Sequence, residues 1–135
     1  MSRSGYSDDC DNINLYRGNV ERVLRSKRGR AFLVEMAAAL DAMDDKQLEL
    51  NVLVCETGCC AMGAVALARG LDTHRIDPEE PDDVASAFGI NRIMAAEIAY
   101  ENDEGMPWSV IETPEQRWVR MRQWVAAWLA KAPLR

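Results

Sequence analysis

Apolar and polar positions follow the spacing of α-helices along most of the chain. Between residues 29 and 43, apolar side chains recur at steps of four, four and three, which places them on one helix face. The members of this stripe are Phe32, Met36, Leu40 and Met43. Residues 60–69 are apolar nearly all round and are followed by Gly70 and Leu71, the pattern of a central buried helix that ends in a Schellman motif.

Local capping signals predict where other helices begin. Asn19 is suited to cap a short helix reaching about residue 25, and Asn91 to cap one reaching about residue 102. The clearest signal is Thr113-Pro114-Glu115-Gln116, with a cap, a proline at the first helical position and a glutamine that completes a capping box. The helix that follows is expected to run to about residue 131.

These patterns predict an all-α fold, a compact small helical domain of about five helices. Apolar residues alternate only within residues 48–54, and Thr57-Gly58 marks a turn after them, so one short strand or hairpin is expected near 48–58. Residues 1–18 hold few apolar side chains. We therefore expect a loosely ordered N-terminal segment over 1–18 and a single helical domain over 19–135.

Charge is distributed unevenly along the 135 residues. The 16 basic and 22 acidic side chains give a net charge of −6, which argues against a strongly basic nucleic-acid-binding protein. Residues 71–115 hold two basic and twelve acidic side chains, whereas residues 116–135 hold five basic side chains and no acidic one. Either the basic ends neutralise the acidic middle, or the acidic middle forms a surface directed at a cationic partner.

A partner-binding surface is the interpretation that we favour for the acidic segment. Trp124 lies off the main apolar stripe of the last helix, as expected of an interface anchor or of a residue at the rim of the core. Adjacent acids at helix ends also serve simply as partners of the helix dipole. The predicted partner-binding residues are Asp82, Asp83, Glu97, Glu101, Asp103, Glu104 and Trp124.

Residues 84–100 have the spacing of a helix-turn-helix motif. Gly89 follows Ala85 by four residues, and apolar side chains after it would face the first helix. Acidic residues dominate the second helix, which is the wrong sign of charge for DNA. The structural interpretation is a helical hairpin within a small bundle, and the alternative function is a small helix-turn-helix-like DNA-associated regulator.

A basic cluster spans residues 22–30. It is suited to hold a phosphate or a nucleic-acid strand, alone or with the arginines of the last helix, or to pair with the acidic middle of the same chain. The arginines of the last helix are Arg117, Arg120 and Arg122.

Residue types that carry catalysis or bind metals show no supporting pattern. Cys55 and Cys59 have plausible ligand spacing, but the second ligand pair typical of zinc sites is missing and His74 is the single histidine. Cys60 opens an apolar run, where a thiol packs as a small hydrophobic side chain. No P-loop, GxGxxG, GxSxG or HExxH motif occurs. We expect no enzymatic activity, no cofactor and no metal site.

The sequence also bears on location. No apolar run approaches the length of roughly 18 residues that a membrane span needs, and residues 1–11 are polar without the apolar core of a secretory signal. A cytoplasmic protein without membrane contact is expected.

Three groups of residues carry a family resemblance. They are residues 27–33 with 39–43, residues 60–64 with 69–72, and residues 88–90 with 97–104 and 112–118. Together they resemble a family of small uncharacterised proteins encoded by bacteriophages and prophages, over roughly residues 25–128. The resemblance brings no activity or site residue with it.

A phage origin would imply an accessory protein that binds a host or phage macromolecule. An acidic face can occupy a site meant for nucleic acid, because it presents the same sign of charge. We therefore expect a non-enzymatic, phage-encoded binding module that inhibits or modulates a host macromolecular complex in the bacterial cytoplasm. Among such modules we favour counter-defence of the anti-CRISPR type.

Overall fold

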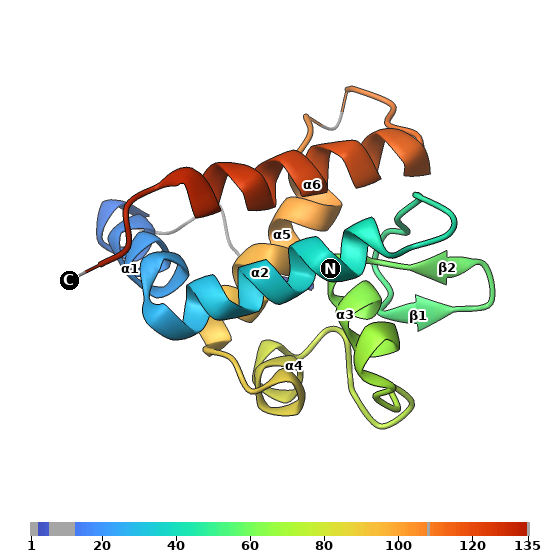
Figure 1. Ribbon diagram of the computed structural model, residues 1–135, viewed down its shortest axis with the longest axis horizontal. Coiled ribbons are helices and arrows are strands. Elements are labelled where there is room, and N and C mark those ends of the chain that lie inside the picture. Colours follow the sequence, from blue (N-terminus) through green and yellow to red (C-terminus); the bar gives the residue numbers. More distant parts are fainter. Residues whose placement is uncertain (1–2, 6–12, 108, 135) are drawn as a thin grey trace.

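Six helices and one hairpin make up the part of the chain that the computed structural model describes, residues 3–5, 13–107 and 109–134 (Figure 1). The predicted all-α class is confirmed. The helices are α1 (Ile13–Arg25), α2 (Lys27–Asp41), α3 (Ala61–Arg69), α4 (Pro81–Phe88), α5 (Arg92–Glu104) and α6 (Pro114–Ala130), and the strands are β1 (Val54–Cys55) and β2 (Gly58–Cys59).

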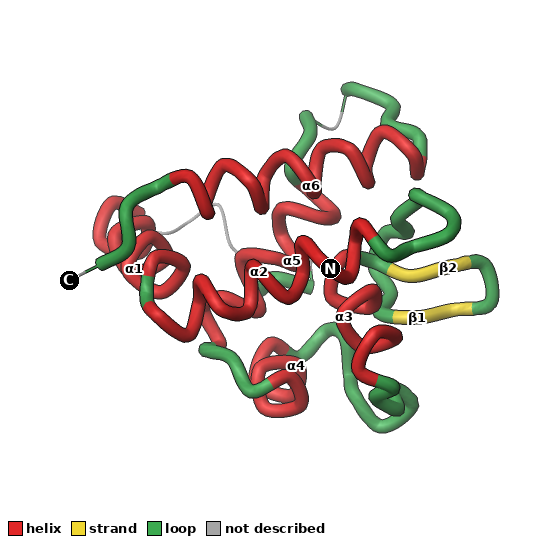
Figure 2. Tube along the Cα trace, in the orientation of Figure 1, coloured by secondary structure: helices red, strands yellow, loops and turns green. Residues whose placement is uncertain are grey.

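Helix α5 lies at the centre of the arrangement. Helices α2 and α6 run side by side, α1 closes one end, and α3 with the hairpin closes the other (Figures 1 and 2). Helix α5 contacts α1, α3, α4 and α6, and its residues 94–98 are all buried. The core is apolar and draws on every helix, with fully buried side chains that include Leu24, Leu33, Leu40, Val65, Ile98 and Met121. None of the described helices is both long and apolar enough to cross a membrane.

The capping signals in the sequence are confirmed at three helix ends. The Thr113 hydroxyl accepts the Gln116 N–H, and the Gln116 side chain accepts the Thr113 N–H, which completes the capping box of α6. Asn91 caps α5, and Gly70 adopts the left-handed conformation after α3 with φ of 69°. The Leu71 N–H then donates to the Ala66 carbonyl, as a Schellman motif requires.

Helix α1 begins at Ile13, so the prediction that Asn19 caps it is wrong. Tyr16, one turn before the buried Val20, packs against the core and extends the apolar face towards the N-terminus. Within the predicted loose segment 1–18, Arg3 and Ser4 are also buried, while residues 1–2 and 6–12 lie outside the described residues.

A hairpin forms where the sequence predicts one, with its two strands at residues 54–59. Val54 pairs with Cys59 and Cys55 with Gly58 in antiparallel register. In the run before the hairpin, the Leu48 N–H donates to the Pro114 carbonyl at 3.0 Å, and the Glu49 N–H donates to the Cys59 carbonyl of β2 at 2.8 Å. Residues 48 and 49 therefore link the start of α6 to β2, which leads directly into α3.

We expect Gly63→Ala to destabilise the fold by about 3 kcal/mol, the upper end of the usual cost of overpacking. A Cβ at Gly63 would overlap the Leu53 carbonyl oxygen and lie 2.8 Å from the Cβ of Cys59. The matched control is Gly18→Ala in α1, where a Cβ meets no atom within 4 Å. The control should gain about 0.5–1 kcal/mol from better helix propensity. Urea denaturation measures both, and equal midpoints for the two variants would contradict the close approach of α3.

Candidate functional site

Three of the predicted partner-binding carboxylates lie inside the molecule. Glu97 is 2% exposed, and Arg17 of α1 donates to both of its carboxylate oxygens at 2.9 Å. Glu101 is partly buried, and the Arg120 guanidinium of α6 donates to its carboxylate at 3.2 Å. The third is Asp103. The expectation that these three face a partner is wrong, because each is covered by an arginine from a distant part of the chain.

Asp103 is the centre of a buried polar cluster. Arg3 donates to its two carboxylate oxygens at 2.6 and 2.7 Å, and the Asn51 N–H donates to it at 3.1 Å. Asn102 next to it accepts the Ala61 N–H at the start of α3. The cluster therefore ties the N-terminal residues and the start of α3 to the end of α5.

The charge states within these ion pairs depend on burial and on neighbours. Burial alone would lower the pKa of the Arg3 guanidinium, but its bonds to Asp103 raise that pKa above the ordinary value. For Glu101, burial raises the pKa of the carboxyl and outweighs the opposing effect of Arg120.

The arginines of α6 are used internally, so they do not join the basic cluster of residues 22–30. Arg120 binds Glu112 at 2.6 Å, and Arg117 donates to the Leu48 carbonyl at 2.6 Å. Arg122 pairs with Asp41 of α2 at 2.8 Å. Neutralisation within the chain, one of the two interpretations of the charge pattern, thus takes place at these residues.

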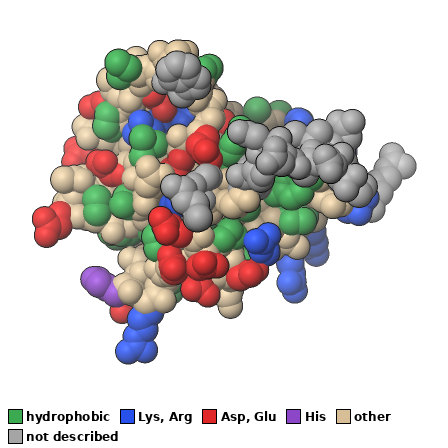
Figure 3. All heavy atoms as spheres, turned by 180° about the vertical axis from the view of Figure 1, so that it is seen from behind, with side chains coloured by type: hydrophobic (Ala, Val, Ile, Leu, Met, Phe, Trp, Pro, Cys, Tyr) green, Lys and Arg blue, Asp and Glu red, His purple; other side chains and the backbone are tan. Residues whose placement is uncertain are grey.

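Five exposed carboxylates follow one another closely in the sequence at the start of α4. We call Asp77, Glu79, Glu80, Asp82 and Asp83 the acidic ridge; all five are exposed. The two prolines at positions 78 and 81 hold the first part of this segment in a turn, and α4 begins only at Pro81. Figure 3 shows Asp and Glu side chains gathered along the lower part of the face seen from behind.

Within the described structure, the acidic ridge has one ion pair. Arg92 reaches Asp82 at 3.0 Å, with both side chains largely exposed to solvent. Asp77 also accepts the Glu79 N–H at 2.9 Å. Sequence reasoning selected Asp82 and Asp83 but missed the other three members. The signal was the Asp-Pro-Glu-Glu-Pro order, because two prolines so close together oppose a regular buried helix.

The two other predicted residues lie apart from this ridge in the sequence. Glu104 is exposed at the last position of α5. Trp124 is half-buried on α6, packs against the core and meets Trp128 edge to face, with 6.5 Å between ring centroids. Trp124 therefore lies at the rim of the core in this structure.

Helices α4 and α5 form the hairpin that the sequence predicts, joined by Gly89 in the left-handed conformation with φ of 71°. The second helix of a DNA-binding motif must present a face to the groove. Here the middle of α5 is buried between its neighbours, and Glu97, expected to be exposed, points into an internal ion pair. The burial of α5 therefore argues against DNA reading by this hairpin.

The cysteines do not form a metal centre with His74 in the described structure, where no group of three metal-binding side chains occurs. Cys55, Cys59 and Cys60 are free thiols. The Cys60 sulfur accepts the Gly63 N–H at 3.4 Å and so caps α3. His74 lies on an exposed loop, with its Nδ1 atom 2.8 Å from the Oδ1 atom of Asp72.

Comparison of the chain with protein-family models, with curated proteins and with solved structures finds no match. The acidic ridge is thus the candidate functional site on geometric grounds.

We expect Arg3→Ala to cost about 3–5 kcal/mol of stability, because it leaves the Asp103 carboxylate buried without its cation. Adding Asp103→Asn should recover part of the loss, since an amide keeps an acceptor for the Asn51 N–H without a buried charge. Guanidinium denaturation of the two variants measures the difference. A double variant no more stable than Arg3→Ala would refute the uncompensated charge as the cause.

Thiol reactivity should separate Cys55 from its two neighbours. Cys55 is exposed and its hydrogen bond with Thr57 lowers the pKa of its thiol, whereas burial raises the pKa of Cys59 to about 12. In a Cys10→Ser background, Ellman's reagent at neutral pH should modify one thiol rapidly and the other two only after unfolding. Adding Cys55→Ser should remove the rapid phase. Two rapid thiols in the folded protein would contradict this burial pattern.

Proposed function

We propose that this protein is a non-enzymatic binding module that docks through the acidic ridge on a cationic surface of a macromolecular complex. The observation that carries the proposal is the exposure of five carboxylate side chains within seven residues, with one of them paired to an arginine. The other acids named as partner-binding residues on α5 are for the most part neutralised inside the fold, so the ridge is where negative charge is offered to a partner.

The neighbouring carboxylates of the ridge repel each other. A cationic surface that covers them reduces this repulsion, which favours binding. Two ridge members, Asp82 and Asp83, lie in the first turn of α4, where the helix dipole stabilises their negative charge. Glu79 and Glu80 make no comparable contribution to the fold, since Glu80 at the N-cap position makes no side-chain capping bond. Their carboxylates are available for a partner.

The class of partner follows from the sign of the charge and from the family resemblance. A row of carboxylates presents the same sign of charge as a nucleic-acid backbone, so it suits a protein surface that normally binds phosphates. The resemblance to phage-encoded proteins directs the proposal to a host complex in the bacterial cytoplasm. The function that we propose is counter-defence of the anti-CRISPR type, by occupation of a nucleic-acid site.

The test is a charge reversal on the acidic ridge with a matched reversal elsewhere. Glu79→Lys with Glu80→Lys should abolish retention of a nucleic-acid-binding complex from lysate of a bacterial host, because the ridge then repels a cationic surface. Asp44→Lys with Asp45→Lys makes the same change in net charge at exposed residues after α2 and should retain the complex. Added DNA should compete with the unaltered protein, and higher salt should weaken its binding.

Equal retention by the two charge-reversed proteins would show that the acidic ridge is not the docking surface. Failure of the unaltered protein to retain any complex that DNA can displace would refute the proposed function itself. Circular dichroism on each variant establishes that the helical fold is kept.

A further inference from the structure

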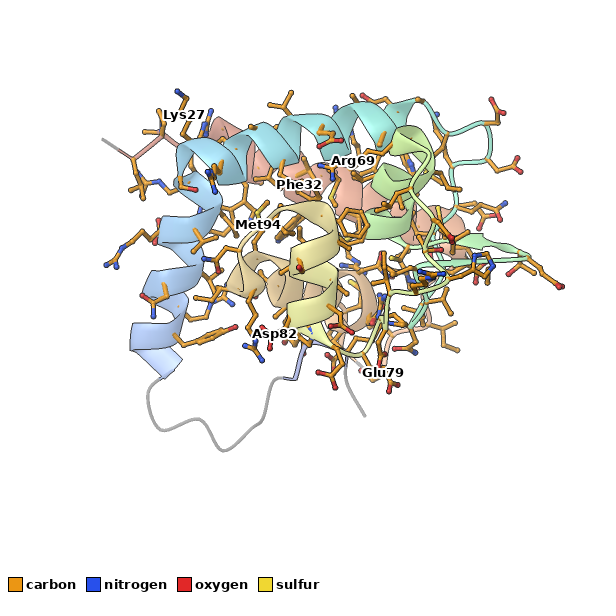
Figure 4. All side chains as sticks on the ribbon, turned by 90° about the horizontal axis from the view of Figure 1, so that it is seen from below. Lys27, Phe32, Arg69, Glu79, Asp82 and Met94 are labelled. Atoms are coloured by element: carbon orange, nitrogen blue, oxygen red, sulfur yellow. The ribbon has the colours of Figure 1, made fainter. Side chains whose placement is uncertain are left out.

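A hollow of about 520 Å³ opens between the corner where α1 meets α2 and the turn from α4 to α5. Its floor is apolar and includes Val23, Ala85, Ile90 and Met94. Figure 4 shows Met94 in the space between α1 and α4, with Asp82 and Glu79 of the acidic ridge at the other end of α4. The volume falls within the range of about 300–1,000 Å³ typical of small-molecule sites.

Two arginines form the charged part of the wall. Arg22 and Arg28 line the hollow, are exposed, and make no ion pair or hydrogen bond with any other described residue. Their neighbours Arg25 and Arg30 are instead tied to backbone carbonyls near the C-terminus, at 2.7 and 2.8 Å. Arg22 and Arg28 are therefore the cations of the basic cluster that are available at this hollow.

Nothing in the described wall of the hollow offsets the two arginines. No Asp or Glu lines it. The carbonyls that end α1 and α4 here are already bonded, the Val23 carbonyl to the Ser26 hydroxyl at 2.6 Å and the Ala85 carbonyl to the Ile90 N–H at 3.0 Å. The starts of α2 and α5 meet at the same place, where Ser26 and Asn91 cap them and line the hollow. The balance of charge is positive.

We propose that this hollow binds a phosphate ester of mononucleotide size, with its phosphate on Arg22 and Arg28 and its apolar part on the floor around Met94. Guanidinium groups suit phosphate oxygens because their N–H groups match them in a bidentate arrangement. The apolar floor accepts a planar or aliphatic group and excludes water around it. This site is separate from the acidic ridge.

Isothermal titration calorimetry with AMP, adenosine and inorganic phosphate tests the site. AMP should bind. Adenosine lacks the contact with the arginines and inorganic phosphate lacks the contact with the apolar floor, so each should bind at least about tenfold more weakly than AMP. Arg22→Ala and Arg28→Ala should each weaken AMP binding about tenfold or more, as expected for a charge-assisted hydrogen bond.

Two further variants separate the hollow from general surface charge. Lys27→Ala removes the cation next to Arg28 from a residue that does not line the hollow, and should leave AMP affinity within about twofold. Ser86→Trp fills the hollow from an exposed position without changing its charge, and should weaken AMP and adenosine alike.

The proposal fails if AMP does not bind, or if Lys27→Ala weakens AMP as much as Arg22→Ala does. Binding of a single-stranded oligonucleotide without binding of AMP would also overturn it and would identify an extended basic surface instead. The Glu79→Lys, Glu80→Lys protein should bind AMP normally, which keeps this test independent of the proposed docking function.

Discussion

The fold depends on a set of arginines that reach the acidic side chains of α5 from distant parts of the chain. Arg3, Arg17 and Arg120 come from the N-terminal residues, α1 and α6, and they bind Asp103, Glu97 and Glu101. Buried ion pairs add little net stability compared with apolar contacts, but removal of one member leaves a charge that the interior does not tolerate. The central helix is therefore compatible with this fold only when both ends of the chain are docked around it.

This internal pairing decides what the outside of the molecule offers. It withdraws Glu97, Glu101 and Asp103 of α5 from the surface, and two groups of like charge stay exposed. Negative charge stays at the start of α4, where five acids are exposed. Positive charge stays at the corner between α1 and α2, where Arg22 and Arg28 have no described partner. The surface of this acidic protein thus carries an exposed acidic group at α4 and an exposed basic pair at the α1–α2 corner, besides exposed charges elsewhere such as Asp44 and Asp45.

Local sequence patterns predicted the helices well, because they depend on neighbours in the chain. The capping box at Thr113 and the glycine ends after α3 and α4 are decided within a few residues. The start of α1 was missed because its first turns are supported by tertiary contacts such as that of Tyr16 with the core. No local rule carries that information.

The candidate site was harder to predict, for a related reason. A count of charge along residues 71–115 does not say which acids face inwards. The sequence around Glu97 did indicate burial, because Glu97 lies within an apolar run. Its neighbours Met94, Ala95, Ala96 and Ile98 are all buried. An acid within such an apolar run needs a cation from elsewhere. Arg3 and Arg17, which supply two such cations, lie in a segment whose composition suggested loose structure.

The exposed ion pair between Asp82 and Arg92 lies between the acidic ridge and the hollow. It joins the start of α4 to the first residue of α5, directly after Asn91 in the wall of the hollow. A partner that supplies its own cation to Asp82 releases Arg92 beside that wall. Because both side chains are largely exposed and dissolved ions screen their attraction, this exchange changes little at the hollow, and the two charged regions act independently.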